Sequence, residues 1–535
     1  MTTAQNNILT MAQYYSGTAL CNIGGTIEFD IEGLNADIIE KTINILVEKM
    51  DGFRIRLCKN GDNIEQYFED YSYITIPVVD MRGKSEQDID EYVQSKIAEP
   101  IELFDEKLYR WTILQKDHTW VVLIYMHHMI SDAWSFALLA EKGAELFQQM
   151  IDGTPIICEL PSYSLHIDNE ANYFDSTKYA RDKQHWSSVY TEKPIITQLK
   201  PGKEKSRNPQ AHRLTEIIDG DFFDRISKFC TEYRYSPAIL FEAVVLVYLK
   251  KINGQESVPS VGMAALNRLG RSEKNTFGMF ISTLPITVPF SVDFSLLDVC
   301  KQLSEVQTKA FFHQRYPYTH LLQDIREAHH DVDSLYDVMV SYQNATMHSN
   351  VKAHTKWYTN GNSEVPLALH IDDRDNVGKY VLNLDYQLEQ FSDEEAELLL
   401  RRLLYITEQI VRCPEQTVSE TKIIPKEEYS LLTETFNNTT TAYPSDRCVH
   451  ELFEAVARDN PDKTAVVFEE NAYSYAEINR MANSIAYTLR NFGIGKDDIV
   501  PVISARSHFV IAAQLGVLKA GAAYLPIDPS FPQDR

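Results

Sequence analysis

The chain has 535 residues, enough for about three or four domain-sized units. Hydrophobic residues make up 44% of it and charged residues 24%, a composition typical of a globular protein. Its 51 Lys and Arg against 76 Asp and Glu give a formal net charge of −25, which argues against binding nucleic acid or an anionic membrane through a basic surface.

The seven cysteines lie far apart and form no Cys-x-x-Cys pair, so we expect neither a disulfide scaffold nor a structural zinc site. The first residues, MTTAQNNILTMAQYY, lack the basic and apolar regions of a signal peptide. No apolar run approaches the ~20 residues needed to span a bilayer. These features predict a cytoplasmic protein without a membrane partner.

Strands and helices alternate along the first 150 residues. We expect extended segments at 24–31, 53–57, 74–79 and 120–126. The last of these, WVVLIYM, is apolar on both faces, which indicates a buried central strand. Helices are predicted after Asn35, which can act as a cap, and again over the apolar positions that follow the strand at 120–126.

A polar stretch at 168–190 separates this region from a second one and is predicted to be a charged helix. Ser392 and Glu395 form a capping box that opens a long helix. The other elements expected here are a helix at 237–249 and strands at 284–288, 337–342 and 380–386.

Residues 414–443 are rich in Thr, Asn, Pro and Glu and are interpreted as a domain boundary. Beyond them we expect a helix at 449–457, a hairpin at 470–471, a helix from 475, a strand at 499–504 and a helix ending near 521. No later strand is expected, so the last residues are interpreted as part of a cut domain.

The sequence MHHMISDAWS places His127 and His128 at the end of the buried strand, with Asp132 at the start of a helix. Adjacent residues of a strand point to opposite sides, so only one imidazole can face a reaction centre. Burial favours the neutral imidazole that a general base needs. A structural pair, a plain helix cap at Asp132 and a metal site remain alternatives, whereas no GxSxG supports a serine hydrolase.

MHHMISDAWS resembles the HHxxxDG signature of the condensation domains of nonribosomal peptide synthetases, which are related to chloramphenicol acetyltransferase. Further segments resemble other motifs of this family in the expected order: TMAQYY at 10–15, KMDGFRIRL at 49–57, YSLHID at 163–168, FGMFISTLP at 277–285, HQRYPY at 313–318 and SYQN at 341–344. After residue 445, YSYAEI and LKAGAAYLPID are similar to the opening motifs of an amino-acid adenylation domain.

The resemblance implies an α/β fold in which two acetyltransferase-like subdomains form a V-shaped pseudo-dimer around a tunnel. The implied divisions are 1–170 and 171–425 for the two halves, 426–445 for a linker and 446–535 for a truncated adenylation segment. Donor and acceptor carrier proteins would deliver acyl groups on 4′-phosphopantetheine arms. An amide bond would form between them, with no cofactor or metal bound by this chain. Because no carrier precedes the domain, the donor is expected in trans or the module starts assembly.

By the same resemblance, His128 is the catalytic base, and His127 and Asp132 support it. Asp132 is expected to form an ion pair with Arg54. The remaining candidates are the active-site loop residues Ala133, Trp134 and Ser135 and the pocket residues Ser282, His313, Ser341 and Gln343.

Three positions depart from the family pattern. Ala133 replaces the signature glycine, which would strain the loop if this position required a positive φ. Ser282 stands where the family has asparagine, and Asp51 and Gly52 replace a His-Glu pair.

Three alternative functions stay open. An epimerization domain shares the signature and would exchange the donor α-hydrogen. A free-standing or starter-type acyltransferase would use a diffusible or fatty acyl donor. A silent docking module would bind carriers without turnover.

Overall fold

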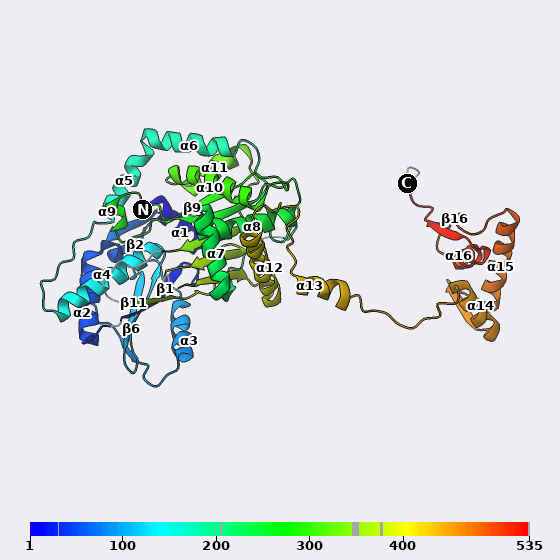
Figure 1. The fold of residues 1–535 in the computed structure, drawn as a ribbon, viewed down its shortest axis with the longest axis horizontal. Coiled ribbons are helices and arrows are strands. Elements are labelled where there is room, and N and C mark those ends of the chain that lie inside the picture. The colour runs from blue at the N-terminus through cyan, green and yellow to red at the C-terminus, as the bar shows by residue number, and fades with distance from the viewer. Residues whose placement is uncertain (30, 62, 204–205, 345–352, 375–377, 533–535) are drawn as a thin grey trace. The chain divides into compact units, whose positions relative to one another are not determined.

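The computed structural model describes the chain except for residues 30, 62, 204–205, 345–352, 375–377 and 533–535. It divides into two compact units, Met1–Tyr429 and Ser430–Arg535, and Figure 1 shows the elements of each. Within the described residues, no helix has both the length and the apolar character that a membrane crossing requires.

The first unit contains a five-stranded sheet with the order β11-β1-β6-β5-β4. Its central strand β6 is antiparallel to both of its neighbours, and Val121 to His127 are all buried, which confirms the predicted core strand. The strands are β1 (Asn22–Phe29), β4 (Val78–Asp80), β5 (Tyr109–Gln115), β6 (Trp120–His127) and β11 (Ala353–Trp357). The helices of this part are α1 (Thr3–Tyr14), α2 (Ala36–Lys49), α3 (Glu86–Ile97) and α4 (Ala133–Ile151).

A second, six-stranded sheet in the same unit has the order β7-β13-β12-β10-β8-β9. Its strands are β7 (Ala211–Ile218), β8 (Ser260–Ala265), β9 (Ser282–Thr287), β10 (Val338–Gln343), β12 (Leu367–Asp372) and β13 (Tyr380–Gln387). The helices are α7 (Gly220–Tyr233), α8 (Pro237–Asn253), α9 (Arg271–Lys274), α10 (Leu296–Phe312), α11 (Tyr318–Ala328) and α12 (Asp393–Arg412). The capping box predicted at Ser392 and Glu395 opens α12.

Each sheet has its own hydrophobic core. The core of the first sheet includes α2 and α4, and the core of the second includes α8, α10 and α12. Two segments from the later part of this unit pack with the first sheet: β11 pairs with β1, and Phe277, Met279 and Phe280, which follow α9, are buried in the first core. The second of these segments brings the residues after α9 to the start of α4.

Several local predictions are wrong. Within the expected extended segment 53–57, Phe53 and Arg54 instead complete a 3₁₀ turn, η1 (Asp51–Arg54), before the hairpin of β2 (Ile55–Asn60) and β3 (Asn63–Phe68). Only the end of the segment 74–79 enters a strand, β4.

The charged stretch forms two helices rather than one. These are α5 (Ser164–Phe174) and α6 (Thr177–Val189). The break has a local cause, because the Ser176 side chain accepts a hydrogen bond from the backbone N–H of Tyr179 and thereby caps a new helix.

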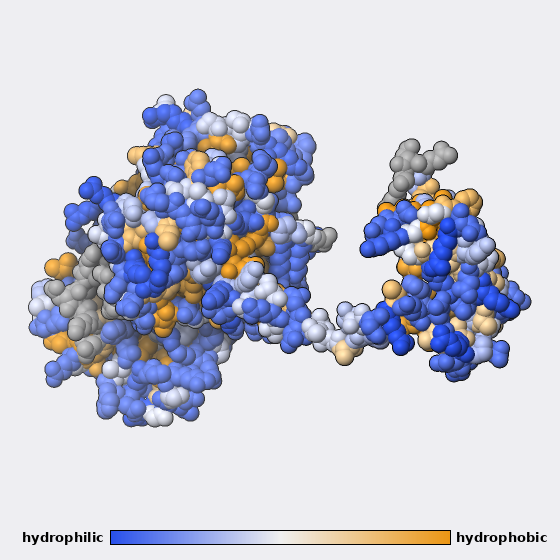
Figure 2. All heavy atoms as spheres, turned by 45° about the vertical axis from the view of Figure 1, so that its right-hand side comes forward, coloured by the Kyte–Doolittle hydropathy of each residue, from blue (hydrophilic) through white to orange (hydrophobic). Residues whose placement is uncertain are grey.

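The second unit is small. It contains η2 (Leu431–Thr435), α14 (Val449–Asp459), α15 (Tyr475–Asn491), α16 (His508–Ala520) and the hairpin of β14 (Thr464–Phe468) and β15 (Asn471–Ser474). A strand does follow α16, contrary to expectation: β17 (Ala523–Ile527) pairs in parallel with β16 (Ile499–Ile503). Figure 2 shows apolar surface beside charged surface on this unit, and Val467, Ile499 and Ile503 are among its exposed residues. The short helix α13 (Lys426–Ser430) spans the division between the units.

Candidate active site

The loop between β6 and α4 carries the two histidines and Asp132. The backbone N–H groups of His127 and His128 donate to the carbonyl oxygens of Leu108 and Cys21, respectively. These hydrogen bonds fix the end of β6 to the residues that precede β5 and β1 on its two sides. Asp132 is the N-cap of α4 and accepts a hydrogen bond from the N–H of Ser135 at 2.8 Å. The loop is therefore fixed at its entry and at its exit.

The two imidazole rings have different surroundings. The His127 side chain is buried, and its Nδ1 accepts a hydrogen bond from the Met129 N–H at 3.1 Å. Burial, together with a smaller effect of the neighbouring His128, lowers the pKa of His127 to about 3. His128 is half-buried as a residue, and its Nδ1 is buried without a hydrogen-bond partner among the described residues.

His128 is held in its neutral form. Burial lowers its pKa, although the Asp132 carboxylate and the backbone carbonyl groups of His128 and Ser131 act in the opposite direction. A neutral imidazole can accept a proton at neutral pH. The electrostatic surroundings of His128 thus suit a general base.

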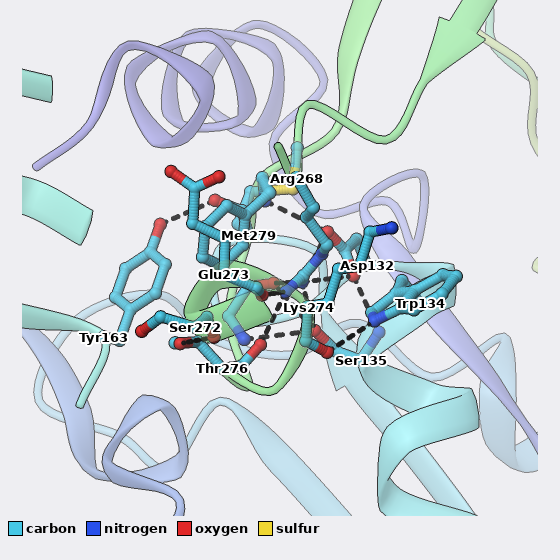
Figure 3. Close-up of polar contacts among 12 residues, drawn as sticks. Asp132, Trp134, Ser135, Tyr163, Arg268, Ser272, Glu273, Lys274, Thr276 and Met279 are labelled. Carbon is cyan, nitrogen blue, oxygen red and sulfur yellow. Dashed lines mark hydrogen bonds and ion pairs between the residues drawn. The ribbon is translucent and has the colours of Figure 1, made fainter. Parts of the chain in front are cut away.

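Asp132 forms a buried ion pair with Arg268, as Figure 3 shows. Both side chains have no solvent exposure, and Nη2 of Arg268 lies 3.0 Å from each carboxylate oxygen. The Phe280 N–H donates to the same carboxylate at 3.1 Å. Asp132 therefore has donors from α4, from the loop before α9 and from the segment after it, which leaves it poorly suited to bind a metal.

The expected pair of Asp132 with Arg54 is wrong. Arg54 instead donates from Nη1 to the Glu69 carbonyl oxygen at 2.9 Å, near the end of β3. The physical reason is that the loop before α9, which carries Arg268, and the segment after α9, which carries Phe280, both meet the start of α4, where Arg268 is buried against the carboxylate.

Arg268 also organises its own loop. Its Nη1 donates to the carbonyl oxygens of Glu273 and Thr276, and its guanidinium carbon lies 3.8 Å from the centre of the Phe280 ring. The Ser135 hydroxyl forms two further hydrogen bonds between α4 and the segment after α9. Its Oγ donates to the Gly278 carbonyl oxygen and accepts from the Gly278 N–H. One arginine thus connects the loop between β6 and α4 to the segment around α9.

Ala133 and Trp134 occupy the first turn of α4. Ala133 is the first residue of the helix and has no positive φ, so replacing the family glycine causes no backbone strain here. The Trp134 indole Nε1 donates to the Lys274 carbonyl oxygen at 2.8 Å, which binds α4 to α9.

The departure at Asp51 and Gly52 has a structural explanation. The Asp51 carboxylate accepts from the Tyr163 N–H at 2.9 Å and from the Ser162 hydroxyl. A Cβ on Gly52 would lie 2.7 Å from the Phe277 ring, and a Cβ on Gly278 would lie 2.1 Å from the ring of Tyr163. The two glycines therefore allow the segment after α9 to approach this closely.

A pocket lies beside the start of α4. Ser341 and Gln343, both in β10, line it together with Ala133 and Trp134. Ser282, the first residue of β9, is not among the residues that line this pocket, although the preceding Ile281 is. The expectation that His313 is a pocket residue is wrong for this pocket, because His313 is not among the residues that line it.

His313 lies instead where α6 meets the end of α10. Its Nδ1 is 2.7 Å from an oxygen of the buried Asp182, and its ring stacks on His185 with the ring centres 4.0 Å apart. Two helices packing together create this site, which the local sequence around 313–318 does not indicate.

Sequence reasoning missed Arg268, Trp357 and Arg374. Arg268 lies 136 residues after Asp132, in a loop without a motif that points to it. Trp357 and Arg374 both line the pocket, and Trp357 is in β11, the strand that joins the first sheet from far along the chain. No periodic pattern in the sequence marks these three positions.

Comparison with known proteins identifies two segments. Residues 1–433 match the condensation domain family, and residues 453–535 match the AMP-binding enzyme family. One of the subunits of plipastatin synthase from Bacillus subtilis is 28% identical over all of this chain, and surfactin synthase subunit 1 of the same organism is 27% identical. The chain spans only 21% and 15% of the lengths of these relatives.

Solved structures agree on the fold. The starter condensation domain of rhizomide synthetase, in complex with C8-CoA, superposes with a TM-score of 0.70 at 18% identity, covering 79% of this chain and 96% of that one. A four-domain nonribosomal peptide synthetase bound to AMP and glycine has a TM-score of 0.78 at 18% identity, over 100% of this chain and 42% of that one. The mixed α/β fold expected from the sequence is thus confirmed, and the chain belongs to the condensation domain family, followed by a segment of an AMP-binding enzyme.

Proposed function

We propose that residues 1–433 form an amide bond between a donor acyl thioester and the amine of an acceptor aminoacyl group. The observation that carries this proposal is the position of His128, whose pKa burial lowers, at the start of a loop whose Asp132 forms a buried ion pair with Arg268. Membership of the condensation domain family supports the reaction type.

In the proposed reaction, the acceptor amine attacks the thioester carbonyl carbon as His128 takes a proton from the nitrogen. A C–N bond forms, the C–S bond breaks, and the protonated His128 returns its proton to the leaving thiolate. General-base help of this kind contributes about 10²–10⁴-fold to the rate. Ala133 keeps its backbone N–H at the first position of α4, where a developing oxyanion could be stabilised.

The partners we propose are donor and acceptor carrier proteins that present their acyl groups on 4′-phosphopantetheine arms. Tethering would raise the effective concentration of two reactants that must meet at one histidine. The reduced cytoplasm is the compartment we propose, because all seven cysteines are free thiols. The halves 1–170 and 171–425, the linker 426–445 and the adenylation segment 446–535 remain our division of the chain.

The test is substitution of the base. His128→Ala is expected to reduce amide formation from two loaded carriers by about 10²-fold or more, measured as carrier-bound product by intact mass. His330→Ala, at an exposed histidine after α11, is the matched control and is expected to react like the unmodified protein. Equal product from His128→Ala would overturn the catalytic assignment.

The same assay separates the alternative functions. An acyl-CoA donor that replaces the donor carrier would indicate a starter-type acyltransferase, an alternative suggested by the relative that holds C8-CoA. Loss of deuterium from the donor α-carbon without a new amide would indicate epimerization. Carrier binding with no product would indicate a docking module.

A further inference from the structure

The first turn of α1 is buried and is attached to α5 and to the residue that precedes it. Thr2 and Gln5 have no solvent exposure. The Thr2 Oγ1 lies 3.4 Å from the Tyr163 hydroxyl oxygen, and the Thr3 N–H donates to the Glu170 carboxylate at 2.7 Å. These contacts hold the start of α1 in place.

Gln5 uses both ends of its side-chain amide. Its Oε1 accepts from the Thr2 N–H at 2.9 Å, which is one half of the capping box that opens α1. Its Nε2 donates to the Met129 carbonyl oxygen at 3.1 Å. Only this orientation of the amide pairs both atoms, because one faces a donor and the other an acceptor. Since Met129 directly follows His128, Gln5 connects α1 to the turn that carries this histidine.

The choice of glutamine at this position has a physical reason. A capping box accepts Glu as readily as Gln, and the N-terminus of a helix favours the negative charge. The capping boxes of α3, α10, α12 and α15 accordingly use an acid, namely Asp88, Asp298, Glu395 and Glu477. An ionised carboxylate has no hydrogen to donate. Only an amide can cap α1 and also donate to Met129 at neutral pH.

The bond from Gln5 extends a series of hydrogen bonds around His128. The His128 N–H donates to the Cys21 carbonyl oxygen at 2.7 Å, and the Met129 N–H donates to Nδ1 of His127 at 3.1 Å. The peptide groups on both sides of the His128 Cα are therefore held, and Gln5 holds the next one. Because Met129 has no solvent exposure, losing this donor leaves a buried carbonyl oxygen without a partner.

We propose that Gln5 is a positioning residue for His128: it holds the Met129 carbonyl and thereby fixes the turn that orients the imidazole toward the acceptor amine. This inference rests on the proposed function, in which His128 takes the proton. Because Gln5 is fully buried, it acts through the turn and does not touch the substrate. A displaced base slows the reaction step more than it weakens binding, so the expected effect is on kcat rather than on KM.

The decisive variant is Gln5→Met, which keeps the length of the side chain but removes the donor. We expect kcat for amide formation, corrected for the folded fraction, to fall about tenfold, with KM for both loaded carriers changed by less than about twofold. Because Gln5→Met also weakens the cap of α1, Ser85→Ala, which removes the exposed cap of α3, is the matched control. This control is expected to lose stability in urea and to keep the kcat of the unmodified protein.

Gln5→Glu is the conservative variant that tests rescue. A protonated carboxyl group can accept from the Thr2 N–H and donate to the Met129 carbonyl, whereas an ionised one can only accept. Burial favours the protonated form, so at about pH 6 we expect Gln5→Glu to have a higher kcat than Gln5→Met. Each kcat is divided by that of the unmodified protein at the same pH, which removes the titration of His128 from the comparison.

A measurement without turnover follows His128 directly. The NMR signal of its ring, in protein labelled at histidine and assigned from its absence in His128→Ala, is expected to shift in Gln5→Met and to stay in place in Ser85→Ala. An unmoved signal in Gln5→Met would overturn the proposal, and so would a kcat equal to that of Ser85→Ala or an absence of rescue by Gln5→Glu. If the unmodified protein formed no amide, the proposed function would fail, whereas the ring signal would still show whether Gln5 holds the turn.

Discussion

Asp132 and Asp182 are two buried carboxylates that connect segments far apart in the sequence, but they do so in different ways. Asp132 is held by a fully buried arginine and by the backbone N–H groups of Ser135 and Phe280. Among the described residues, the Asp182 carboxylate is held by three side chains, namely the Tyr173 hydroxyl, His313 and Lys178, and the last two are 27% and 39% exposed.

This difference gives the two carboxylates different roles: Asp132 positions a loop, whereas Asp182 stabilises the contact of two helices. Backbone N–H groups cannot move without moving the chain, so the contacts of Asp132 determine where the His128 loop lies. Partly exposed side chains can be replaced by water at small cost, so Asp182 is expected to stabilise the contact of α6 and α10 without controlling the site.

The largest effect is expected from Asp132→Asn. This substitution keeps a helix cap but leaves the Arg268 charge buried and unpaired, which costs about 3–5 kcal/mol. Urea unfolding measures the loss, and amide formation is expected to fall with it. Asp219→Asn, at an exposed cap of α7, is the control. An unchanged unfolding midpoint in Asp132→Asn would contradict the role assigned to the ion pair.

The next largest expected effect is a pH dependence of folding stability that comes from His127. Its folded pKa of about 3 lies below the ordinary 6.5, so the unfolded chain binds the proton first as the pH falls. Its stabilising contribution is complete above pH 6.5 and is lost below it, by up to about 1.4 kcal/mol per pH unit. His127→Asn preserves an acceptor for the Met129 N–H but does not titrate.

The measurement is the urea midpoint between pH 7.5 and 5. The slope of stability against pH is expected to be shallower in His127→Asn than in the unmodified protein, whereas His330→Asn, at an exposed site, should keep the original slope. Identical slopes in all three proteins would show that His127 does not stay neutral. His166, whose pKa burial lowers to about 4, contributes in the same direction.

A smaller effect is expected from Asp182→Asn, which removes the charge but keeps a hydrogen-bonding side chain. We expect a loss of about 1 kcal/mol in unfolding free energy and normal amide formation. Asp175→Asn, at an exposed residue between α5 and α6, is the control. A fall in turnover as large as that of Asp132→Asn would erase the distinction between the two carboxylates.

The smallest effect is expected from Ala133→Gly, which restores the family residue. Because Ala133 already has helical backbone geometry, glycine adds only unfolded-state entropy and costs at most about 1 kcal/mol. Ala36→Gly, at the first residue of α2, provides the matched comparison. A large gain in turnover from Ala133→Gly alone would mean that the loop needs a conformation that alanine resists.

Local features of the fold were predictable because their causes lie within a few residues. Asn35 caps α2 through the N–H of Ile38, and Ser392 with Glu395 opens α12. The apolar run at 120–126 became β6 because a strand buried on both faces needs no polar residues. The break at Ser176 and the strand β17 were missed, since a single cap and a short final strand leave weak patterns.

The residues alone indicated the family and the alternation of strands and helices. They also placed His127 and His128 at a strand end and Asp132 at the start of the next helix. Three-dimensional contacts were needed to show that Asp132 pairs with Arg268 rather than Arg54, that His313 binds Asp182, and that Trp357 and Arg374 share a pocket with Ser341. The physical reason is that periodicity and capping act over a few residues, whereas these contacts depend on chain segments that meet from far apart, above all the packing of β11 and of the segment after α9 with the first sheet.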